Sequence, residues 1–209
     1  TSIELEPNHA VVHFELGKVF ARLGNFDAAN REYQRAIELD PGMAEAHYQL
    51  GVSYARLGRL DLAVKRYQKA LTLDATNPML YAALGNAYAE LDKLDLAVSQ
   101  YRRAIELGQE KSQFYYWMGR AQAGLKQFEE AIDSYHRSLE SNPRNAFVYF
   151  ALGQALFALE RHDLAAEEMR RAVELAPRLH EAHFGLAQVY DALELPDLAL
   201  RSYRRTLEL

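Results

Sequence analysis

Two histidines spaced one helical turn apart are the first residues in this sequence whose types could do chemistry. His180 and His183 have a spacing at which two imidazoles can hold a metal ion. No third ligand accompanies them. His13 and His47 are expected on neighbouring helices about 8–10 Å apart, too far to share one ion. We therefore expect no metal site.

Three arginine pairs form a basic stripe that could contact nucleic acid. The pairs are Arg102-Arg103, Arg170-Arg171 and Arg204-Arg205. Glu106, Glu174 and Glu208 each lie three residues beyond the second arginine of a pair, so i,i+3 ion pairs account for the stripe more simply. Because the net charge is -5, a polyanion is disfavoured as the main partner. We expect no nucleic-acid binding.

The sequence has no pattern typical of an enzyme. It contains no glycine-rich phosphate loop, nucleophile elbow or pair of catalytic carboxylates. The absence of cysteine excludes thiolate metal sites and cysteine nucleophiles. No apolar run approaches the length of a membrane span, and no secretion signal opens the chain. We expect a soluble, non-enzymatic chain without a cofactor or direct membrane insertion; the cytoplasm is favoured, and the periplasm stays open.

The elements that position these residues are repeated. The stretch from Ala10 to Met43 recurs every 34 residues without insertion. With Ala10 as the first place of a unit, the eighth place is glycine in the first five units and the twentieth is alanine in all six. The glycines are Gly17, Gly51, Gly85, Gly119 and Gly153, and the alanines are Ala29, Ala63, Ala97, Ala131, Ala165 and Ala199. A period held this strictly predicts one structural unit copied six times.

Each unit is predicted to be a pair of helices. Apolar residues at i, i+3, i+4 and i+7, such as Val12, Leu16 and Val19, predict a first helix, A, which Gly24 ends in the first unit. A second helix, B, should begin at the eighteenth place, where an acidic residue caps its free N–H groups. These acids are Asp27, Asp61, Asp95, Glu129, Asp163 and Asp197. The small residues of the eighth and twentieth places should let helices A and B approach to roughly 8–10 Å.

The spaced pattern A-x-x-x-x-x-L-G-x-x-Y…G-x-x-x-x-A…Y-x-x-A…P resembles the tetratricopeptide repeat, and the resemblance covers essentially the whole chain. It implies an all-α fold, an α-solenoid of antiparallel helix pairs wound into a right-handed superhelix. We expect a single array over residues 1–209, in which 1–9 are the tail of a preceding repeat and the units are 10–43, 44–77, 78–111, 112–145, 146–179 and 180–209. Because no capping helix follows the last unit, the chain is interpreted as a fragment of a longer protein.

The resemblance also implies that a segment of a partner protein lies in a concave groove walled by the A helices. The groove residues expected to contact this segment are Tyr48, Met79, Asn86, Gln113, Tyr116, Trp117, Arg120, Phe147, Phe150, Gln154, Phe157 and Phe184. Aromatic residues concentrate in the fourth and fifth units, and alanines such as Ala83 and Ala123 leave hollows beside them, a pattern typical of binding hot spots. The alternative is that 114–118 form one apolar helix face buried by its neighbours.

Two specific binding modes of similar arrays are not matched. Arrays that grip a C-terminal carboxylate resemble one another in having lysine at the fifth place and asparagine, arginine or lysine at the ninth. This chain has Asn86 and Arg120 at the ninth place but no lysine at the fifth, so the two-sided grip is missing. An asparagine ladder at the sixth place is also missing. A segment with apolar anchors, steadied by basic residues, suits the wall better. The basic residues are Lys18, Arg22, Arg56 and Arg120.

The leading hypothesis is a non-enzymatic protein–protein interaction scaffold that binds a peptide segment or helix of a partner through aromatic anchors. The alternative is a substrate-recruiting or assembly arm of a larger enzyme or membrane-associated complex. Self-association through apolar helix faces at the ends of the array is a third possibility.

Overall fold

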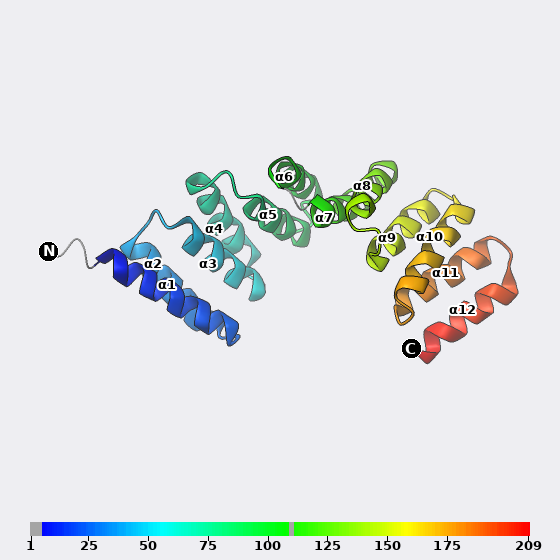
Figure 1. Ribbon diagram of the computed structural model, residues 1–209, viewed down its shortest axis with the longest axis horizontal. Helices are drawn as coiled ribbons and strands as arrows, with labels where there is room; N and C mark the ends of the chain where they lie inside the picture. Colours follow the sequence, from blue (N-terminus) through cyan, green and yellow to red (C-terminus); the bar gives the residue numbers. More distant parts are fainter. Residues whose placement is uncertain (1–5, 109–110) are drawn as a thin grey trace. The chain divides into compact units, whose positions relative to one another are not determined.

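The computed structural model describes residues 6–108 and 111–209, which contain twelve α-helices (Figure 1). These are α1 (Glu6–Arg22), α2 (Phe26–Leu39), α3 (Ala44–Arg56), α4 (Leu60–Leu73), α5 (Pro78–Glu90), α6 (Leu94–Leu107), α7 (Lys111–Gly124), α8 (Phe128–Ser141), α9 (Ala146–Ala158), α10 (His162–Leu175), α11 (His180–Ala192) and α12 (Pro196–Glu208). They form two compact halves, the N-terminal half (1–109) and the C-terminal half (110–209). The all-α prediction is confirmed, while the single array over 1–209 stays a prediction.

Within each half of the chain the helices pack in sequential pairs. Each odd-numbered helix, the predicted helix A, packs against the even-numbered helix B that follows it. Only three residues separate the two helices of a pair, so the partners run antiparallel. Each helix B also packs against the next helix A of the same half. The predicted stacking of helix pairs is therefore confirmed in both halves.

A glycine of helix A lies directly against a large side chain of helix B in the first five units. A Cβ atom added at Gly17 would lie 2.6 Å from the Tyr33 ring, and one added at Gly51 would lie 2.6 Å from the Tyr67 ring. Gly85, Gly119 and Gly153 face Tyr101, Tyr135 and Met169 in the same way. Van der Waals repulsion forbids so short a carbon–carbon distance, so the first five units need glycine at the eighth place for this approach, whereas the sixth unit has Ala187 there and its helices α11 and α12 also pack together.

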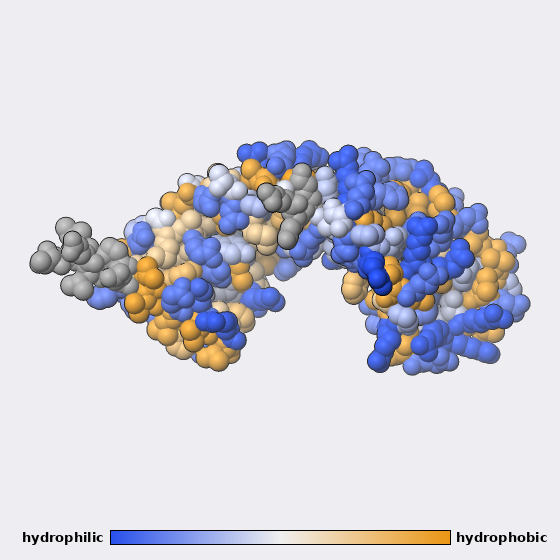
Figure 2. Space-filling model, in the orientation of Figure 1, coloured by the Kyte–Doolittle hydropathy of each residue, from blue (hydrophilic) through white to orange (hydrophobic). Residues whose placement is uncertain are grey.

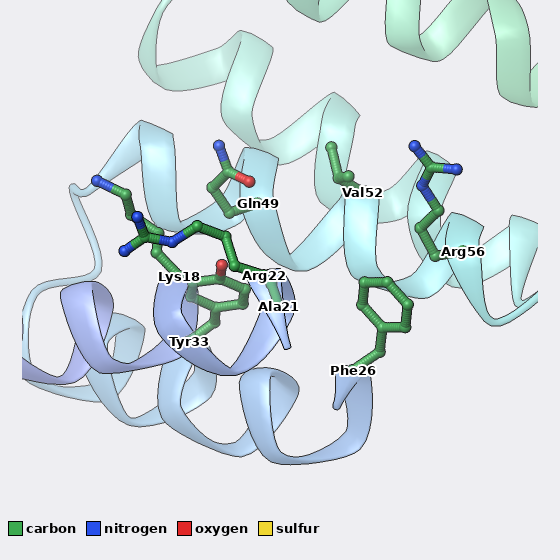
Figure 3. Close-up of a pocket in the computed structure, with 8 residues that line it drawn as sticks. All are labelled: Lys18, Ala21, Arg22, Phe26, Tyr33, Gln49, Val52 and Arg56. Atoms are coloured by element: carbon green, nitrogen blue, oxygen red, sulfur yellow. The ribbon is translucent and has the colours of Figure 1, made fainter. Parts of the chain in front are cut away.

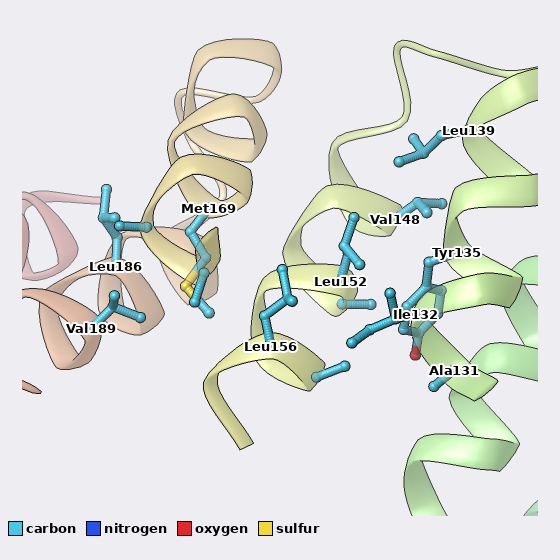
Figure 4. Close-up of a cluster of buried hydrophobic side chains, with 14 residues drawn as sticks. Ala131, Ile132, Tyr135, Leu139, Val148, Leu152, Leu156, Met169, Leu186 and Val189 are labelled. Atoms are coloured by element: carbon cyan, nitrogen blue, oxygen red, sulfur yellow. The ribbon is translucent and has the colours of Figure 1, made fainter. Parts of the chain in front are cut away.

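Buried side chains link one pair to the next (Figure 4). In the C-terminal half one continuous cluster takes side chains from α8, α9, α10 and α11 and includes Tyr135, Leu152, Met169 and Leu186. The alanine of the twentieth place contributes to it through Ala131 and is fully buried. The core thus runs through the stack, as expected for units that each pack on their neighbours.

The turn between helices A and B contains a left-handed residue at the fifteenth place of every unit. Gly24 and Gly58 have φ angles of 75° and 70°. The four later units adopt the same conformation without glycine. Their residues are Asp92 (φ 56°), Lys126 (φ 61°), Glu160 (φ 59°) and Glu194 (φ 57°). Left-handed backbone is unfavourable for such residues by about 1–2 kcal/mol, so the packing of the pair imposes the turn even where the sequence does not favour it.

The acidic residues of the eighteenth place do not cap the B helices, which corrects the sequence prediction. Helix B begins one residue earlier, so the acid lies in its first turn, as Asp27 does in α2. The N-cap of α2 is Asn25, whose Oδ1 accepts a hydrogen bond from the Ala28 N–H at 3.1 Å. At the N-caps of α4, α6, α8, α10 and α12 no side chain accepts a bond. The acids still face the positive end of the helix dipole.

The start of α1 also differs from the prediction. Residues 1–9 were expected to be the tail of a preceding repeat. Residues 1–5 lie outside the described part of the chain, and Glu6 to His9 form the first turn of α1. Pro7 is compatible with this turn because the first N–H groups of a helix have no partner within it.

Apolar side chains gather on the surface of α1 (Figure 2). Val11, Val12 and Leu23 are 50%, 62% and 75% exposed. Self-association would use this kind of surface, and it stays a prediction. Within the described residues, no helix is both long enough and apolar enough to span a membrane.

Asn30 is a polar residue at an otherwise apolar position of helix B. Its side chain is 6% exposed, and neither its Oδ1 nor its Nδ2 has a hydrogen-bond partner. The same place in the next three units holds Val64, Val98 and Ile132. Asn30 therefore buries an amide whose polar atoms lose their hydrogen bonds to water.

The left-handed residue of the turn gives the first testable prediction. Gly58→Ala forces alanine into a left-handed conformation and should lower the free energy of unfolding by about 1–2 kcal/mol. Glu160→Gly relieves the same strain and should not lower it. Thermal unfolding followed by circular dichroism compares the two variants. An equal loss of stability in both would contradict the proposed strain.

The second prediction concerns Asn30. Asn30→Val removes two unsatisfied polar atoms and should raise the free energy of unfolding by about 1–3 kcal/mol, measured by urea denaturation. Asn77 serves as the matched control, because its Oδ1 caps α5 by accepting from the Met79 N–H at 2.9 Å. Asn77→Ala should lower stability by about 1 kcal/mol. A loss of stability in Asn30→Val would show that the amide has a partner.

Candidate functional site

The C-terminal half contains a pocket of about 380 Å³, which we call the aromatic pocket. Helices α7 and α9 supply most of its lining, and α8 and the start of α11 complete it. The lining residues are Tyr116, Arg120, Ala123, Tyr135, Phe147, Phe150, Ala151, Gln154, Leu179 and Glu181. One side chain, that of Tyr135, comes from a helix B. The A helices therefore carry the accessible residues of this pocket.

The aromatic pocket combines apolar and aromatic side chains with one cation and one carboxylate. Tyr116 packs against Tyr135 with ring centroids 6.3 Å apart, and the Arg120 guanidinium lies 5.9 Å from the centre of the Tyr116 ring, within cation–π range. Burial, and then Tyr116, raises the pKa of Tyr135, so its hydroxyl stays protonated at neutral pH. Phe147 is 58% exposed. The pocket thus offers an accessible aromatic surface beside polar groups.

Five of the residues expected to line a groove come together in this pocket. They are Tyr116, Arg120, Phe147, Phe150 and Gln154. Leu179 and Tyr135 were missed. Leu179 precedes α11 at the last place of its unit, and no feature of the repeat marks that place as accessible. Tyr135 belongs to the packing position that faces glycine, so its contribution to a surface pocket was not expected from the sequence.

Trp117 does not line the aromatic pocket. It is half-buried on α7, and its ring centroid lies 6.1 Å from that of Phe114, which is buried. The alternative of a buried apolar face therefore describes Phe114, whereas part of Trp117 remains accessible. Gln113, also on α7, is exposed outside the pocket.

Two other predicted aromatics of the C-terminal half pack against rings of the helix B that follows them. Phe157 of α9 lies against His162 of α10, with ring centroids 5.1 Å apart. Phe184 of α11 is 46% exposed and lies against Tyr203 of α12, with centroids 6.0 Å apart. Neither residue lines the aromatic pocket.

The three predicted residues of the N-terminal half have different surroundings. Tyr48 is half-buried against Tyr67, with ring centroids 5.9 Å apart. Met79 is 46% exposed at the start of α5. The Oδ1 of Asn86 accepts a hydrogen bond from the Tyr101 hydroxyl at 2.7 Å. Asn86 therefore supports the packing of its own helix pair.

The N-terminal half contains a pocket of about 520 Å³, which we call the cationic pocket (Figure 3). Its lining residues are Lys18, Ala21, Arg22, Phe26, Tyr33, Gln49, Val52 and Arg56. Three of the four basic residues singled out from the sequence lie here, and the fourth, Arg120, lies in the aromatic pocket.

The two pockets occupy the same position in the repeat. Each is lined by the ninth, twelfth and twenty-fourth places of one unit and by the sixth and ninth places of the next. In the cationic pocket these residues are Lys18, Ala21, Tyr33, Gln49 and Val52. In the aromatic pocket they are Arg120, Ala123, Tyr135, Ala151 and Gln154. The repeat therefore creates one kind of hollow, and the side chains of each unit decide its chemistry.

The histidine pair has contacts other than a metal ion. The Nε2 of His183 lies 3.1 Å from the Pro177 carbonyl oxygen, and the Nδ1 of His180 lies 3.4 Å from a Glu181 carboxylate oxygen. Among the described residues, no group of three or more His, Asp or Glu side chains has the geometry to hold a metal ion.

The arginine pairs follow the sequence prediction in two of three cases. Arg103 pairs with Glu106 at 2.7 Å, and Arg205 pairs with Glu208 at 3.1 Å. Arg171 instead pairs with the preceding acids Glu167 and Glu168, which corrects the expected pairing with Glu174. Its guanidinium also lies 5.8 Å from the centre of the Tyr149 ring. This stacking holds the guanidinium on the side of the earlier turn.

Comparisons with known proteins agree with the repeat. A family model described as tetratricopeptide repeat matches residues 14–78 and 150–209. A second model of the same description matches 109–178, and one described as TPR repeat matches 85–126. A search of curated protein sequences finds no match.

Several solved structures resemble the chain. MamA is 26% identical, with 78% of this chain and 95% of that chain covered and a TM-score of 0.74. YrrB, described as a TPR protein with an unusual peptide-binding site, is 24% identical, with 87% and 93% covered and a TM-score of 0.75. PilW, described as a type IV pilus biogenesis factor, is 16% identical, with 92% and 90% covered and a TM-score of 0.81. At their identities the last two show the fold alone.

Proposed function

This chain belongs to the tetratricopeptide repeat family, whose arrays are protein-interaction scaffolds, and we propose that it binds a segment of a partner protein in the aromatic pocket. It acts as a scaffold without catalysis of its own. The partner segment contributes a large apolar side chain that packs against Phe147 and Phe150.

The exposure of Phe147 carries this proposal. Its ring is 58% exposed in the wall of a pocket. Each Å² of apolar surface removed from water contributes about 25 cal/mol, and aromatic residues at the centre of an interface are typical hot spots. Tyr116 and Phe150 are already half-buried by their neighbours. The pocket wall is therefore held in position before binding, which lowers the entropy lost on association.

The polar lining residues favour a peptide over a purely apolar ligand. Arg120 and Gln154 are exposed at the ninth places of two successive A helices. A guanidinium and a side-chain amide can bond the carbonyl groups of an extended or helical segment. Glu181, also exposed, can accept a bond from a donor on the same segment. The ligand is thus a peptide with one apolar anchor and polar groups on either side of it.

The third prediction tests the aromatic pocket. Peptides selected from a random phage-displayed library on the full chain should share a large apolar or aromatic residue. Phe147→Ala should weaken the affinity for a selected peptide by about 30-fold, the equivalent of about 2 kcal/mol for a hot spot. Fluorescence anisotropy with the labelled peptide measures this. Because Phe147 is largely exposed, the variant should keep its fold.

Leu164→Ala is the matched control. Leu164 is 51% exposed on α10 in the same half of the chain and lies outside the aromatic pocket. This variant should bind the peptide as the unchanged chain does. Selected peptides without a large apolar residue, or an equal loss of affinity in both variants, would refute the proposed function.

A further inference from the structure

The cationic pocket, which lies in the N-terminal half of the chain, is rich in hydrogen-bond donors. Lys18 and Arg22 from α1 and Arg56 from α3 line it. Lysine and arginine side chains can only donate. Lys18 donates to Glu15 at 2.8 Å, but among the described residues no ion pair involves Arg22 or Arg56. Two guanidinium groups in one pocket are therefore available to an anion.

The carboxylates near this pocket are already engaged. Glu15 accepts from Lys18, and Glu45 accepts from the Nε2 of Gln49 at 2.8 Å. Both carboxylates act electrostatically on Tyr33, as does the guanidinium of Arg22. The two acids neutralise part of the basic charge at the rim and leave the guanidinium groups as its unpaired charges.

A buried hydroxyl in the pocket lacks a partner. Tyr33 is fully buried, and its hydroxyl has no hydrogen bond. In Figure 3 this hydroxyl points up into the space beside Lys18, Arg22 and Gln49. Burial, and then Glu15 and Glu45, raises the pKa of Tyr33 to about 12. The hydroxyl is therefore protonated at neutral pH and can donate a hydrogen bond.

Two tyrosines at the same place of other units, Tyr101 and Tyr203, have a hydroxyl acceptor that Tyr33 lacks. The Tyr101 hydroxyl donates to Asn86 Oδ1 at 2.7 Å, and the Tyr203 hydroxyl donates to Asp191 Oδ2 at 2.6 Å. Asn86 stands at the ninth place, where the first unit has Lys18. Because lysine cannot accept a hydrogen bond, Lys18 cannot act for Tyr33 as Asn86 does for Tyr101, and the Tyr33 hydroxyl has no partner.

Apolar side chains form the rest of the lining. Phe26 and Val52 lie between Arg22 and Arg56 in Figure 3. A free inorganic anion has no group that would contact this apolar surface. An acidic residue next to an aliphatic one in a peptide offers both kinds of contact.

We propose that the cationic pocket binds an acidic peptide segment of a partner, whose side-chain carboxylate accepts bonds from Arg22 and Tyr33 while a neighbouring aliphatic residue contacts Phe26 and Val52. The arrangement differs from the grip of similar arrays on a C-terminal carboxylate. That grip combines lysine at the fifth place with asparagine, arginine or lysine at the ninth; the first unit has Lys18 at the ninth place but Phe14 at the fifth. The cations of this pocket stand at the ninth and thirteenth places.

The test titrates the full chain with a defined peptide by isothermal titration calorimetry. The peptide alternates glutamate and leucine and has an acetylated and an amidated end, so that it has no terminal charges. A matched peptide has glutamine at each glutamate position. The acidic peptide should bind, more weakly as salt is raised, and the glutamine peptide should bind at least about tenfold more weakly, because charge-assisted hydrogen bonds are lost. Equal binding of the two peptides would overturn the proposal.

Three variants assign the binding to this pocket. Arg22→Gln should weaken binding of the acidic peptide about tenfold. Tyr33→Phe should also weaken it and should not lower the melting temperature, since the hydroxyl has no partner to lose. Arg31→Gln removes the same charge from an exposed position of α2 outside the pocket and should leave the affinity unchanged. Unchanged binding in Tyr33→Phe, or an equal loss in Arg31→Gln, would refute the assignment.

Two further measurements distinguish a peptide site in the cationic pocket from binding in the aromatic pocket and from general anion binding. Phe147→Ala, which alters the aromatic pocket, should bind the acidic peptide as the unchanged chain does, so the two sites can fail independently. A loss in Phe147→Ala equal to that in Arg22→Gln would move the peptide to the aromatic pocket and overturn the proposal. Inorganic phosphate should bind more weakly than the peptide. Equal binding of phosphate would reduce the pocket to a general anion site and overturn the proposal as well.

Discussion

The close approach of helices A and B, made in the first four units by a glycine against a tyrosine ring, is the constraint that organises the packing of the pairs. The ring lies where a Cβ atom would otherwise be, 2.6 Å from it at Gly17 and at Gly119. The buried alanine of the twentieth place completes the small surface that lets the two helices approach. Because neither helix of a pair can bury its apolar face alone, this approach and the stacking of pairs form together.

The same ring connects packing to binding. Tyr33 and Tyr135 fill the space over Gly17 and Gly119, and each also lines a pocket. Each pocket lies between successive A helices, at the same places of the repeat. A residue required for folding thus forms part of each binding surface. The side chains around it can vary from unit to unit, because they project from A helices already held by the glycine contact.

The two pockets differ in the free energy that they can supply. The aromatic pocket exposes Phe147 beside half-buried rings, so a ligand gains free energy there by removing this aromatic surface from water. The cationic pocket holds Arg22 and the unpartnered Tyr33 hydroxyl, so a ligand there also gains charge-assisted hydrogen bonds. The first depends little on salt, whereas the second weakens as salt screens the charges. One repeat framework therefore offers two kinds of recognition.

The sequence by itself determined the helix pairs and their spacing, because the 34-residue period and the places of Gly17 and its equivalents are local features that recur. The resemblance to the tetratricopeptide repeat also indicated five residues of the aromatic pocket, because it implied which places of helix A line a groove. The sequence did not predict the left-handed residue at Glu160, because no glycine marks a turn that packing imposes.

Only the tertiary structure decided which side chains of different helices converge. Trp117 and Phe157 share the general pattern of wall residues, yet their rings lie against Phe114 and His162 outside the aromatic pocket. The lack of a partner for the Tyr33 hydroxyl likewise follows from the arrangement of α1, α2 and α3 around it. Such contacts join residues that are distant in sequence. Their geometry depends on how the helices pack, which the periodicity of each helix does not contain.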